Sequence, residues 1–324
     1  MNLKMNNNSQ MDVVFSSDTN YIMPAGVMMT SVSLNNKDAD ITFHALIDGS
    51  VKEKQKQQLE TIVAGNGRHH IKFYLMDASR FVNLPMLGEI KLHITQATYY
   101  RLFLTEILPV EIEKVLYLDG DIVVMGSLKE LWETNIDECS VGCVTDMSEA
   151  VHDYSRLGYS SDFGYFNAGV LLINLKYWRE NKVVDSFWKI MSETPERIRL
   201  HDQDVLNICF YNSKKPLALK YNLQDGFLYK KDYWEVNHQK YENCIQEAIK
   251  QPVIIHYIAR KPWFVGCENP FKNEWLYYLK KTQWRRYKLK RKKPYTFKNR
   301  VGKILRFMHL LPQFEQKDSM YRLL

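Results

Sequence analysis

Two aspartates separated by one glycine, Asp119 and Asp121, are the residues of this chain best suited to hold a cation. Apolar runs flank them on both sides, Val115–Leu118 before and Ile122–Val124 after. A carboxylate in such surroundings is costly to bury unless it is paired or binds a metal. The first run is typical of an interior strand, and open α/β sheets bind ligands at the carboxyl ends of their strands. The pattern therefore predicts a divalent-metal site for a nucleotide-linked substrate.

A polar turn between a strand and a helix is predicted near the start of the chain. The strand Asp12–Ser17 is followed by Asp18, Asn20 and Tyr21, and then by an apolar helix over Ile22–Val32. Such a turn presents the amides of a helix N-terminus to a ligand, and a tyrosine there can stack on a base. Capping of the helix by Asp18 or Asn20 explains the same residues equally well. Both interpretations stay open.

Two further segments carry polar side chains where burial is expected. Asn167 lies in the apolar run Phe166–Leu175, so it needs hydrogen-bond partners, and the small residues after it leave room for a ligand. The cluster His201–Asp204 precedes a predicted helix over Val205–Tyr211. One acidic residue there would suffice as a helix cap, but four hydrogen-bonding side chains exceed that need. We interpret the cluster as a polar wall of a binding site.

Basic and imidazole groups complete the candidates. His256 stands near the end of the buried strand Pro252–Tyr257, where a lone histidine is more often a core residue than a ligand. Lys261 follows closely, which favours a phosphate-binding segment. Arg101 lies on a predicted helix over Ile94–Leu108. It could reach a phosphate or an acidic loop, or simply cover an aromatic surface.

The elements that must position these residues alternate between strands and helices. Further strands are predicted over Ile41–Ile47, Ile71–Leu75 and Val141–Thr145, and further helices over Lys52–Val63, Ser127–Thr134 and Lys176–Ser192. Repeated β–α alternation indicates a largely parallel sheet flanked by helices. We expect one α/β domain over residues 1–275, followed by a separate segment over residues 276–324.

The composition excludes several classes of protein. No apolar run approaches the roughly 18 residues that a transmembrane helix needs. The polar, Asn-rich start of the chain is unlike a signal peptide. The five cysteines are scattered and complete no zinc site, so we expect reduced thiols, as in a cytosolic protein.

The net charge of +7 is concentrated near the C-terminus. Thirteen Lys or Arg and no Asp or Glu lie between Lys280 and Arg306, which leaves a mildly acidic body. One helical face of this segment is apolar, formed by Val301, Ile304, Leu305 and Met308. A basic amphipathic helix is typical of binding to an anionic membrane surface. A solvated tail is one alternative. Nucleic-acid binding is another, which we do not expect because no nucleic-acid-binding module accompanies the run.

Six motifs in order give the chain a family resemblance. Between Val13 and Trp263 they read F-S-S-D-T-N-Y, T-Y-Y-R, Y-L-D-G-D-I-V-V, F-N-A-G-V-L-L-I-N-L, D-Q-D-V-L-N and H-Y…K-P-W. The chain resembles glycosyltransferase family 8, the retaining nucleotide-sugar transferases of the GT-A fold. It looks most like the bacterial lipopolysaccharide and lipooligosaccharide galactosyl- and glucosyltransferases. A lone D-x-D is weak evidence, but six ordered motifs over most of the chain are strong evidence.

The resemblance implies roles for the residues named above. Metal ligands to Mn²⁺, with Mg²⁺ as the alternative, would be Asp119, Asp121 and His256. Asp18, Asn20 and Tyr21 would contact the uracil and ribose of the donor. Lys261 would contact its diphosphate. The transferred hexose would be surrounded by Arg101, Asp119, Asn167, Asp202 and Gln203. Asp202 or the Gln203 amide would face the cationic sugar during catalysis. Because an amide is a poor nucleophile, same-face attack is favoured over double displacement.

The same resemblance implies the partners. UDP-galactose or UDP-glucose would be the donor, and a cell-surface glycan or glycolipid would be the acceptor. The enzyme would be cytoplasmic, at the inner face of the cytoplasmic membrane. One departure supports an alternative. The family pattern H-Y-x-G-x-x-K-P-W is one residue shorter here and lacks its glycine, and Ala259 or Arg260 could replace Lys261 at the phosphate. A non-catalytic protein that binds nucleotide sugars or phosphate is the alternative function.

Overall fold

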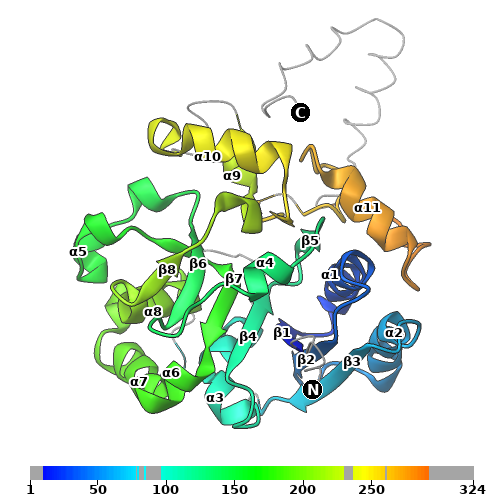
Figure 1. The fold of residues 1–324 in the computed structure, drawn as a ribbon, viewed down its shortest axis with the longest axis horizontal. Coiled ribbons are helices and arrows are strands. Elements are labelled where there is room, and N and C mark those ends of the chain that lie inside the picture. Colours follow the sequence, from blue (N-terminus) through cyan, green and yellow to red (C-terminus); the bar gives the residue numbers. More distant parts are fainter. Residues whose placement is uncertain are drawn as a thin grey trace, which may run out of the picture.

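A seven-stranded sheet forms the centre of the computed structural model, which describes residues 10–77, 79, 84, 96–229, 236–259 and 261–291. Its strand order is β3-β2-β1-β4-β7-β6-β8 (Figure 1). The strands are β1 (Met11–Ser17), β2 (Ile41–Ile47), β3 (His69–Leu75), β4 (Lys114–Leu118), β6 (Val141–Thr145), β7 (Phe166–Asn174) and β8 (Lys214–Pro216). Neighbours pair in parallel except β7, which runs antiparallel to both β4 and β6. The predicted, mostly parallel α/β sheet is confirmed.

Helices cover both faces of this sheet. On one face lie α1 (Ile22–Asn35) and α2 (Glu53–Val63); on the other lie η2 (Gln96–Phe103), α3 (Leu104–Ile107), α6 (Leu175–Glu180), α7 (Val183–Glu193) and α8 (His201–Phe210). Successive side chains of a strand point to opposite faces. Val13 of β1 therefore belongs to one apolar core and Val14 to the other. Burial on both faces explains why the strands read as continuous apolar runs.

A second, three-stranded sheet brings distant segments beside the aspartate pair. It consists of β5 (Ile122–Val124), β10 (Ile254–His256) and β9 (Leu223–Gln224), with β10 in the middle. β10 runs antiparallel to β5, and its register places His256 opposite Ile122. The backbone N–H of Tyr257 donates to the carbonyl O of Asp121 at 3.0 Å. Strand pairing thus positions His256 next to the aspartates.

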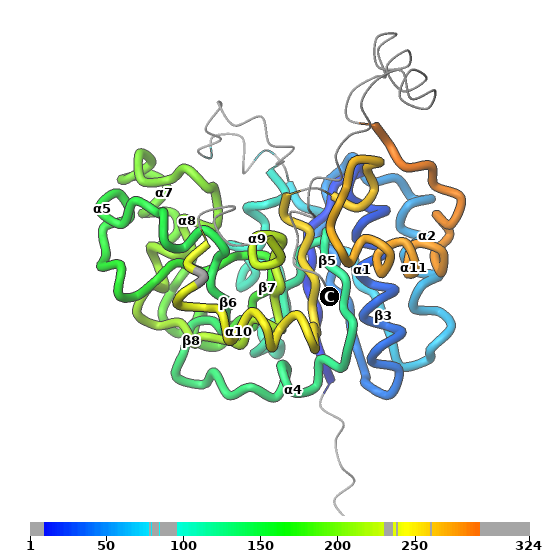
Figure 2. The backbone as a smooth tube through the Cα atoms, turned by 90° about the horizontal axis from the view of Figure 1, so that it is seen from above, coloured from blue at the N-terminus to red at the C-terminus, as the bar shows by residue number. Residues whose placement is uncertain are grey.

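The C-terminal part of the described chain packs back onto the body. Helix α11 (Lys272–Lys280) lies beside α1 (Figures 1 and 2), and its Tyr278 and Leu279 belong to the main core. An added Cβ at Gly26 of α1 would lie 2.3 Å from the ring of Trp284, so that ring packs directly on the helix backbone. The packed body therefore extends beyond residue 275, where we expected the first segment to end.

Residues 292–324 of the expected membrane-binding segment lie outside the described residues. Its amphipathic part, residues 301–308, lies outside the described residues, so its role stays a prediction. Within the described ranges, no helix has both the length and the apolar character required to cross a bilayer. The remaining short elements are α4 (Lys129–Trp132), η3 (Glu149–Val151), α5 (Tyr154–Leu157), η4 (Ser161–Phe163), η5 (Pro195–Arg197), η6 (Leu219–Tyr221), α9 (Asp225–Leu228) and α10 (His238–Lys250).

Three predicted helices differ in detail from the observed ones. The helix predicted over residues 94–108 is largely the 3-10 helix η2 followed by α3; residues 94 and 95 are outside the described ranges. The single helix predicted over residues 176–192 is divided into α6 and α7 at Lys182, whose φ is +48°. The cluster His201–Asp204 does not precede a helix but forms the first turn of α8. Acidic side chains there favour the positive end of the helix dipole.

Candidate active site

Asp119, Asp121 and His256 form a cluster able to hold a metal ion. Each offers one ligand atom, and these atoms lie within 4.8 Å of one another. Nε2 of His256 is 3.2 Å from Oδ1 of Asp121 and 3.9 Å from Oδ2 of Asp119. Asp119 directly follows β4, Asp121 directly precedes β5, and His256 is the last residue of β10. The three predicted metal ligands are brought together by the structure.

Space for a cation depends on Gly169 of β7. A Cβ added there would lie 2.2 Å from Cε1 of His256 and 2.9 Å from Oδ2 of Asp119. Any side chain at this position would therefore fill the space between two of the three candidate ligands. Two carboxylates and one imidazole suit a six-coordinate Mn²⁺ or Mg²⁺ better than a tetrahedral Zn²⁺. The residues present fit a divalent cation.

Lys261 lies against the same cluster despite the shortened loop. Its Nζ donates to Oδ2 of Asp121 and to the carbonyl oxygens of Tyr257 (2.8 Å) and Ile258 (3.0 Å). Burial by itself raises the pKa of Asp121, but the Lys261 ammonium and the His256 imidazole lower it well below its usual range. Burial lowers the pKa of Lys261, and the Asp121 carboxylate more than reverses that effect. The pair is therefore charged at neutral pH.

Of the two proposed substitutes for Lys261, Ala259 has its backbone amide occupied within the protein. The backbone N–H of Ala259 donates to Oδ2 of the buried Asp225 at 2.9 Å, so this amide is held within the protein. Arg260 lies outside the described residues. Among the residues of this loop that the structure describes, Lys261 is the basic residue that contacts the aspartate pair.

Arg101 joins the aspartate pair to α8. Its Nη2 donates to Oδ1 of Asp119 at 2.9 Å, and its Nε lies 2.9 Å from Oδ2 of Asp202. The guanidinium also stacks 4.2 Å from the ring centroid of Tyr117. Burial raises the pKa of Asp202, while Arg101 and the hydroxyl of Thr98 oppose that rise. Arg101 therefore does reach an acidic site, and it also covers an aromatic ring; both sequence interpretations describe it.

Two side-chain amides, Asn167 and Gln203, and the carboxylate of Asp146 form a hydrogen-bond network in the same region. Oε1 of Gln203 accepts from the backbone N–H of Ala168 (2.9 Å) and from Nδ2 of Asn167 (3.2 Å). Oδ2 of Asp146 accepts from Nδ2 of Asn167 (3.0 Å) and from Nε2 of Gln203 (3.3 Å). Burial raises the pKa of Asp146, but hydrogen bonds from His152, Ser148 and Asn167 bring it below its usual value. Asn167 and Gln203, predicted for the sugar site, are in direct contact.

The turn before α1 is held by its own aspartate. Oδ1 of Asp18 accepts from the backbone N–H groups of Asn20 (2.8 Å) and Tyr21 (3.0 Å). These bonds close the turn before the helix and do not cap it, because the N-cap of α1 is Tyr21 and no side chain makes a capping bond there. The role of Asp18 in nucleotide binding stays a prediction. Asn20 is exposed. The ring of Tyr21 lies next to Gly120 and packs edge-on against Trp263, at 5.6 Å between ring centroids.

Comparison with known proteins decides the family. A model of glycosyl transferase family 8 matches residues 12–266. The chain belongs to glycosyl transferase family 8.

Several relatives of this family 8 transferase match over most of their length. The lipopolysaccharide 1,2-glucosyltransferase of Escherichia coli is 30% identical over 266 residues, 81% of this chain and 75% of the relative. The lipopolysaccharide 1,3-galactosyltransferase of Salmonella typhimurium is 29% identical over 280 residues, covering 84% and 79% of the two chains. The crystal structure of galactosyltransferase LgtC with donor and acceptor sugar analogs has a TM-score of 0.73 at 27% identity, covering 84% and 96%. These likenesses confirm the GT-A fold and the prediction of a hexosyltransferase.

The family 8 site contains residues that sequence reasoning missed. Asp146 follows the buried strand β6 directly, as Asp119 follows β4, so its position at a strand end was a usable signal. Asn222 and Asp225 stand around the two-residue strand β9, which no pattern in the sequence marks. Their importance is visible only from the side chains that they contact.

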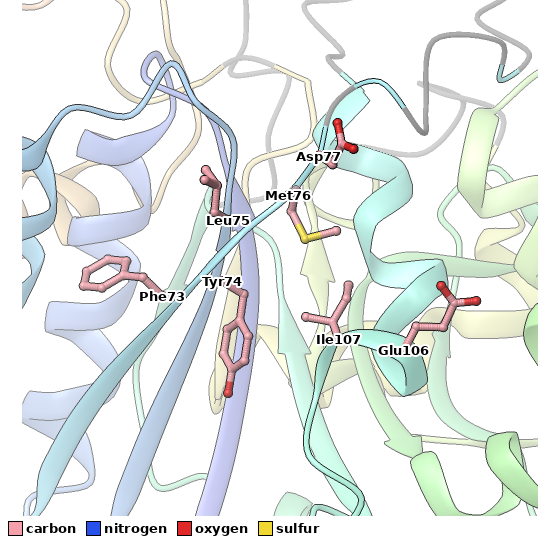
Figure 3. Close-up of a pocket in the computed structure, with 7 residues that line it drawn as sticks. All are labelled: Phe73, Tyr74, Leu75, Met76, Asp77, Glu106 and Ile107. Carbon is pink, nitrogen blue, oxygen red and sulfur yellow. The ribbon is translucent and has the colours of Figure 1, made fainter.

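A separate hollow of about 460 Å³ lies between the end of β3 and α3 (Figure 3). It is lined by Phe73–Asp77, Glu106 and Ile107. None of these is a predicted site residue of the family 8 enzyme, and β3 is at the edge of the sheet, away from β4. The hollow is therefore separate from the cluster of Asp119, Asp121 and His256.

Proposed function

We propose that this enzyme is a metal-dependent, retaining hexosyltransferase that uses a UDP-sugar, galactose or glucose being the transferred hexose. The observation that carries the proposal is the convergence of Asp119, Asp121 and Nε2 of His256 within 4.8 Å, in a space that Gly169 leaves open. Family membership and the named hexosyltransferases among its relatives support the reaction class.

The UDP leaving group would be stabilised by the side chains around Asp119 and Asp121. Asp119, Asp121 and His256 would hold Mn²⁺ or Mg²⁺, whose charge would neutralise the diphosphate as it departs from the anomeric carbon. Lys261 is a second, permanent positive charge beside that position, since Asp121 raises its pKa. A fixed charge that needs no reorganisation during the reaction is an effective source of transition-state stabilisation.

The sugar would be held on the opposite side, around α8. Asp202, Gln203 and Asn167 would bind the hexose, and the Arg101 guanidinium lies between the carboxylates of Asp202 and Asp119. Oε1 of Gln203 already accepts two hydrogen bonds, so it is a poor nucleophile. This favours retention by same-face attack, in which the departing phosphate assists the acceptor hydroxyl, over a double displacement through Gln203.

The acceptor would be a cell-surface glycan such as lipopolysaccharide, as the names of the relatives suggest. The basic segment from Lys280 to Arg306 would bring the enzyme to the anionic inner face of the cytoplasmic membrane, where a lipid-linked acceptor is presented. Both the acceptor and the location rest on sequence and on relatives.

The test is release of UDP from UDP-glucose and UDP-galactose, with water or a lipopolysaccharide core as acceptor. Release should require added Mn²⁺ or Mg²⁺ and stop in EDTA. Asp121→Ala should lower kcat on the order of 10³-fold, because a Lewis-acid metal supplies several kcal/mol. Asp185→Ala, at an exposed position of α7, is the matched control and should leave the rate unchanged. Full turnover of Asp121→Ala in EDTA would rule out the metal site.

A further inference from the structure

Three side-chain amides connect the metal-ligand candidate His256 to the sugar side of the site. Nδ1 of His256 lies 3.0 Å from Oδ1 of Asn222. Nδ2 of Asn222 donates to Oδ1 of Asn167 at 2.9 Å. Asn167 in turn donates to Gln203, as described above. This chain of hydrogen bonds therefore runs from β10 through Asn222, which directly precedes β9, and through Asn167 of β7 to α8.

The directions of these hydrogen bonds follow from two backbone N–H groups, those of Gly169 and Ala168. The N–H of Gly169 donates to Oδ1 of Asn167 at 2.9 Å, and a backbone N–H can only donate. Oδ1 of Asn167 is therefore an acceptor, and its Nδ2 faces Asp146 and Gln203. The N–H of Ala168 fixes the amide of Gln203 in the same manner, at 2.9 Å from Oε1.

The same reasoning reaches the histidine. Because Oδ1 of Asn167 is an acceptor, the atom of Asn222 that faces it must be the donor Nδ2. Oδ1 of Asn222 then faces Nδ1 of His256, so Nδ1 must carry the hydrogen. In the neutral imidazole the lone pair is left on Nε2, the nitrogen that lies 3.2 Å from Asp121.

Burial protects this arrangement from water. Asn222 has no exposed surface, and His256 and Asn167 are 3% and 6% exposed. Partners of a metal-bound histidine fix its tautomer and ring orientation, and their loss typically weakens metal binding 10- to 100-fold. A carboxylate or a backbone carbonyl is the usual partner; here the acceptor is a side-chain amide that also donates onward.

We propose that Asn222 is a positioning residue that sets the tautomer of His256 for metal binding and couples that ligand to Asn167 and Gln203. The inference rests on the metal site of the proposed function. Asn222 contacts neither a proposed metal position nor the reacting atoms. It acts through His256 on one side and Asn167 on the other.

Two substitutions separate the two halves of this role. Asn222→Leu removes both the acceptor and the donor. Mn²⁺ affinity, measured from free Mn²⁺ by electron paramagnetic resonance in the presence of UDP, should fall at least about tenfold.

Asn222→Asp keeps an acceptor for His256 but puts an oxygen opposite Oδ1 of Asn167. It should keep Mn²⁺ affinity within a few-fold and weaken UDP-glucose and UDP-galactose relative to UDP by about tenfold in titration calorimetry.

The matched control is Asn174→Leu. Asn174 is also a buried, hydrogen-bonded asparagine, but it lies at the other end of β7, where it donates to the carbonyl of Ile136. This variant should lose stability and keep wild-type Mn²⁺ affinity. If Asn222→Leu and Asn174→Leu bind Mn²⁺ equally well, Asn222 has only a structural role and the inference is wrong.

A spectroscopic measurement on the unmodified protein does not depend on any variant folding. With Mg²⁺ and UDP bound, long-range proton–nitrogen correlation spectra should show the hydrogen of His256 on Nδ1. A hydrogen on Nε2 would overturn the tautomer assignment. Failure of the wild-type protein to bind Mn²⁺ at all would instead overturn the metal site of the proposed function, and this inference with it.

Discussion

The two aspartates of the central motif have different partners. Asp121 is buried and bonds to Lys261, whereas Asp119 is more exposed and bonds to Arg101 and to the hydroxyl of Tyr117 at 3.2 Å. Each carboxylate thus has its own permanent cation. Burial alone would raise the pKa of Asp121, but the Lys261 ammonium and the His256 imidazole lower it well below its usual range, so this carboxyl is present as the anion that binds a metal.

Gly169 provides the most direct test at the residue scale. Gly169→Ala should lower both Mn²⁺ affinity and kcat, kcat by about 100-fold, since His256 or Asp119 must move by about 1 Å to make room for the methyl group. Mn²⁺ titration and UDP release measure the two effects. Gly126→Ala is the control, because its added Cβ would meet Val253 at an ordinary 3.9 Å. Wild-type Mn²⁺ binding by Gly169→Ala would mean that the cation lies elsewhere.

At the scale of elements, the site is built where two sheets meet. β4 delivers Asp119 at its carboxyl end, and the next three-residue strand, β5, leaves the main sheet to pair with β10. Asp121 stands at that change of sheet. The position agrees with the tendency of α/β folds to bind ligands beyond the carboxyl ends of their strands. Helix α8 contacts this region through the Arg101–Asp202 ion pair, which places it beside the proposed hexose site.

His69, at the start of the edge strand β3, should make the free energy of unfolding depend on pH. His69 is buried, and burial lowers the pKa of its imidazole despite a bond to the carbonyl O of Asn36 at 3.2 Å. The unfolded chain, with a histidine pKa near 6.5, therefore binds the proton more readily than the folded one. The free energy of unfolding should fall as the pH falls below about 6.5.

Urea unfolding at pH 8 and at pH 5.5 measures this effect. The loss of stability on acidification should be smaller in His69→Gln than in the wild type. His70→Gln, at the next and exposed position of the same strand, should keep the wild-type loss. An equal loss in all three proteins would show that other groups cause the acid sensitivity.

At the scale of the whole molecule, the C-terminal segment has two parts. Residues up to Arg291 pack on the body: the N–H of Lys290 donates to the carbonyl O of Trp263 at 3.0 Å, and the N–H of Val265 donates to the carbonyl O of Lys290 at 3.0 Å. These bonds join the segment to the loop that carries Lys261. Residues 292–324 contain the rest of the basic run and the predicted apolar helix face.

Two truncations test this division. A chain that ends at residue 291 should keep its melting temperature and soluble UDP release, but bind phosphatidylglycerol vesicles at least about 100-fold more weakly, because each basic residue contributes on the order of 1 kcal/mol. A chain that ends at residue 275 loses the buried Tyr278, Leu279 and the Trp284 ring. It should be destabilised by several kcal/mol, since roughly 3–5 kcal/mol is typical for deleting one buried aromatic. If the chain that ends at residue 291 binds vesicles as tightly as the full chain, the membrane role is wrong.

From the sequence alone, most strands of the main sheet, the family and the residue types of the site could be predicted, but not the short strands β8 and β9. Apolar runs, polar turns and the D-G-D motif are local patterns, and local burial and propensity decide them. Only the folded chain shows which distant groups meet: His256 pairs with Ile122, Lys261 contacts Asp121, and Asn222 lies next to His256. Strand register and side-chain contacts between separate elements set these, and neither leaves a periodic signal in the chain. For that reason Asp119 and Asp121 could be predicted from the sequence, whereas Asn222, which contacts His256, could not.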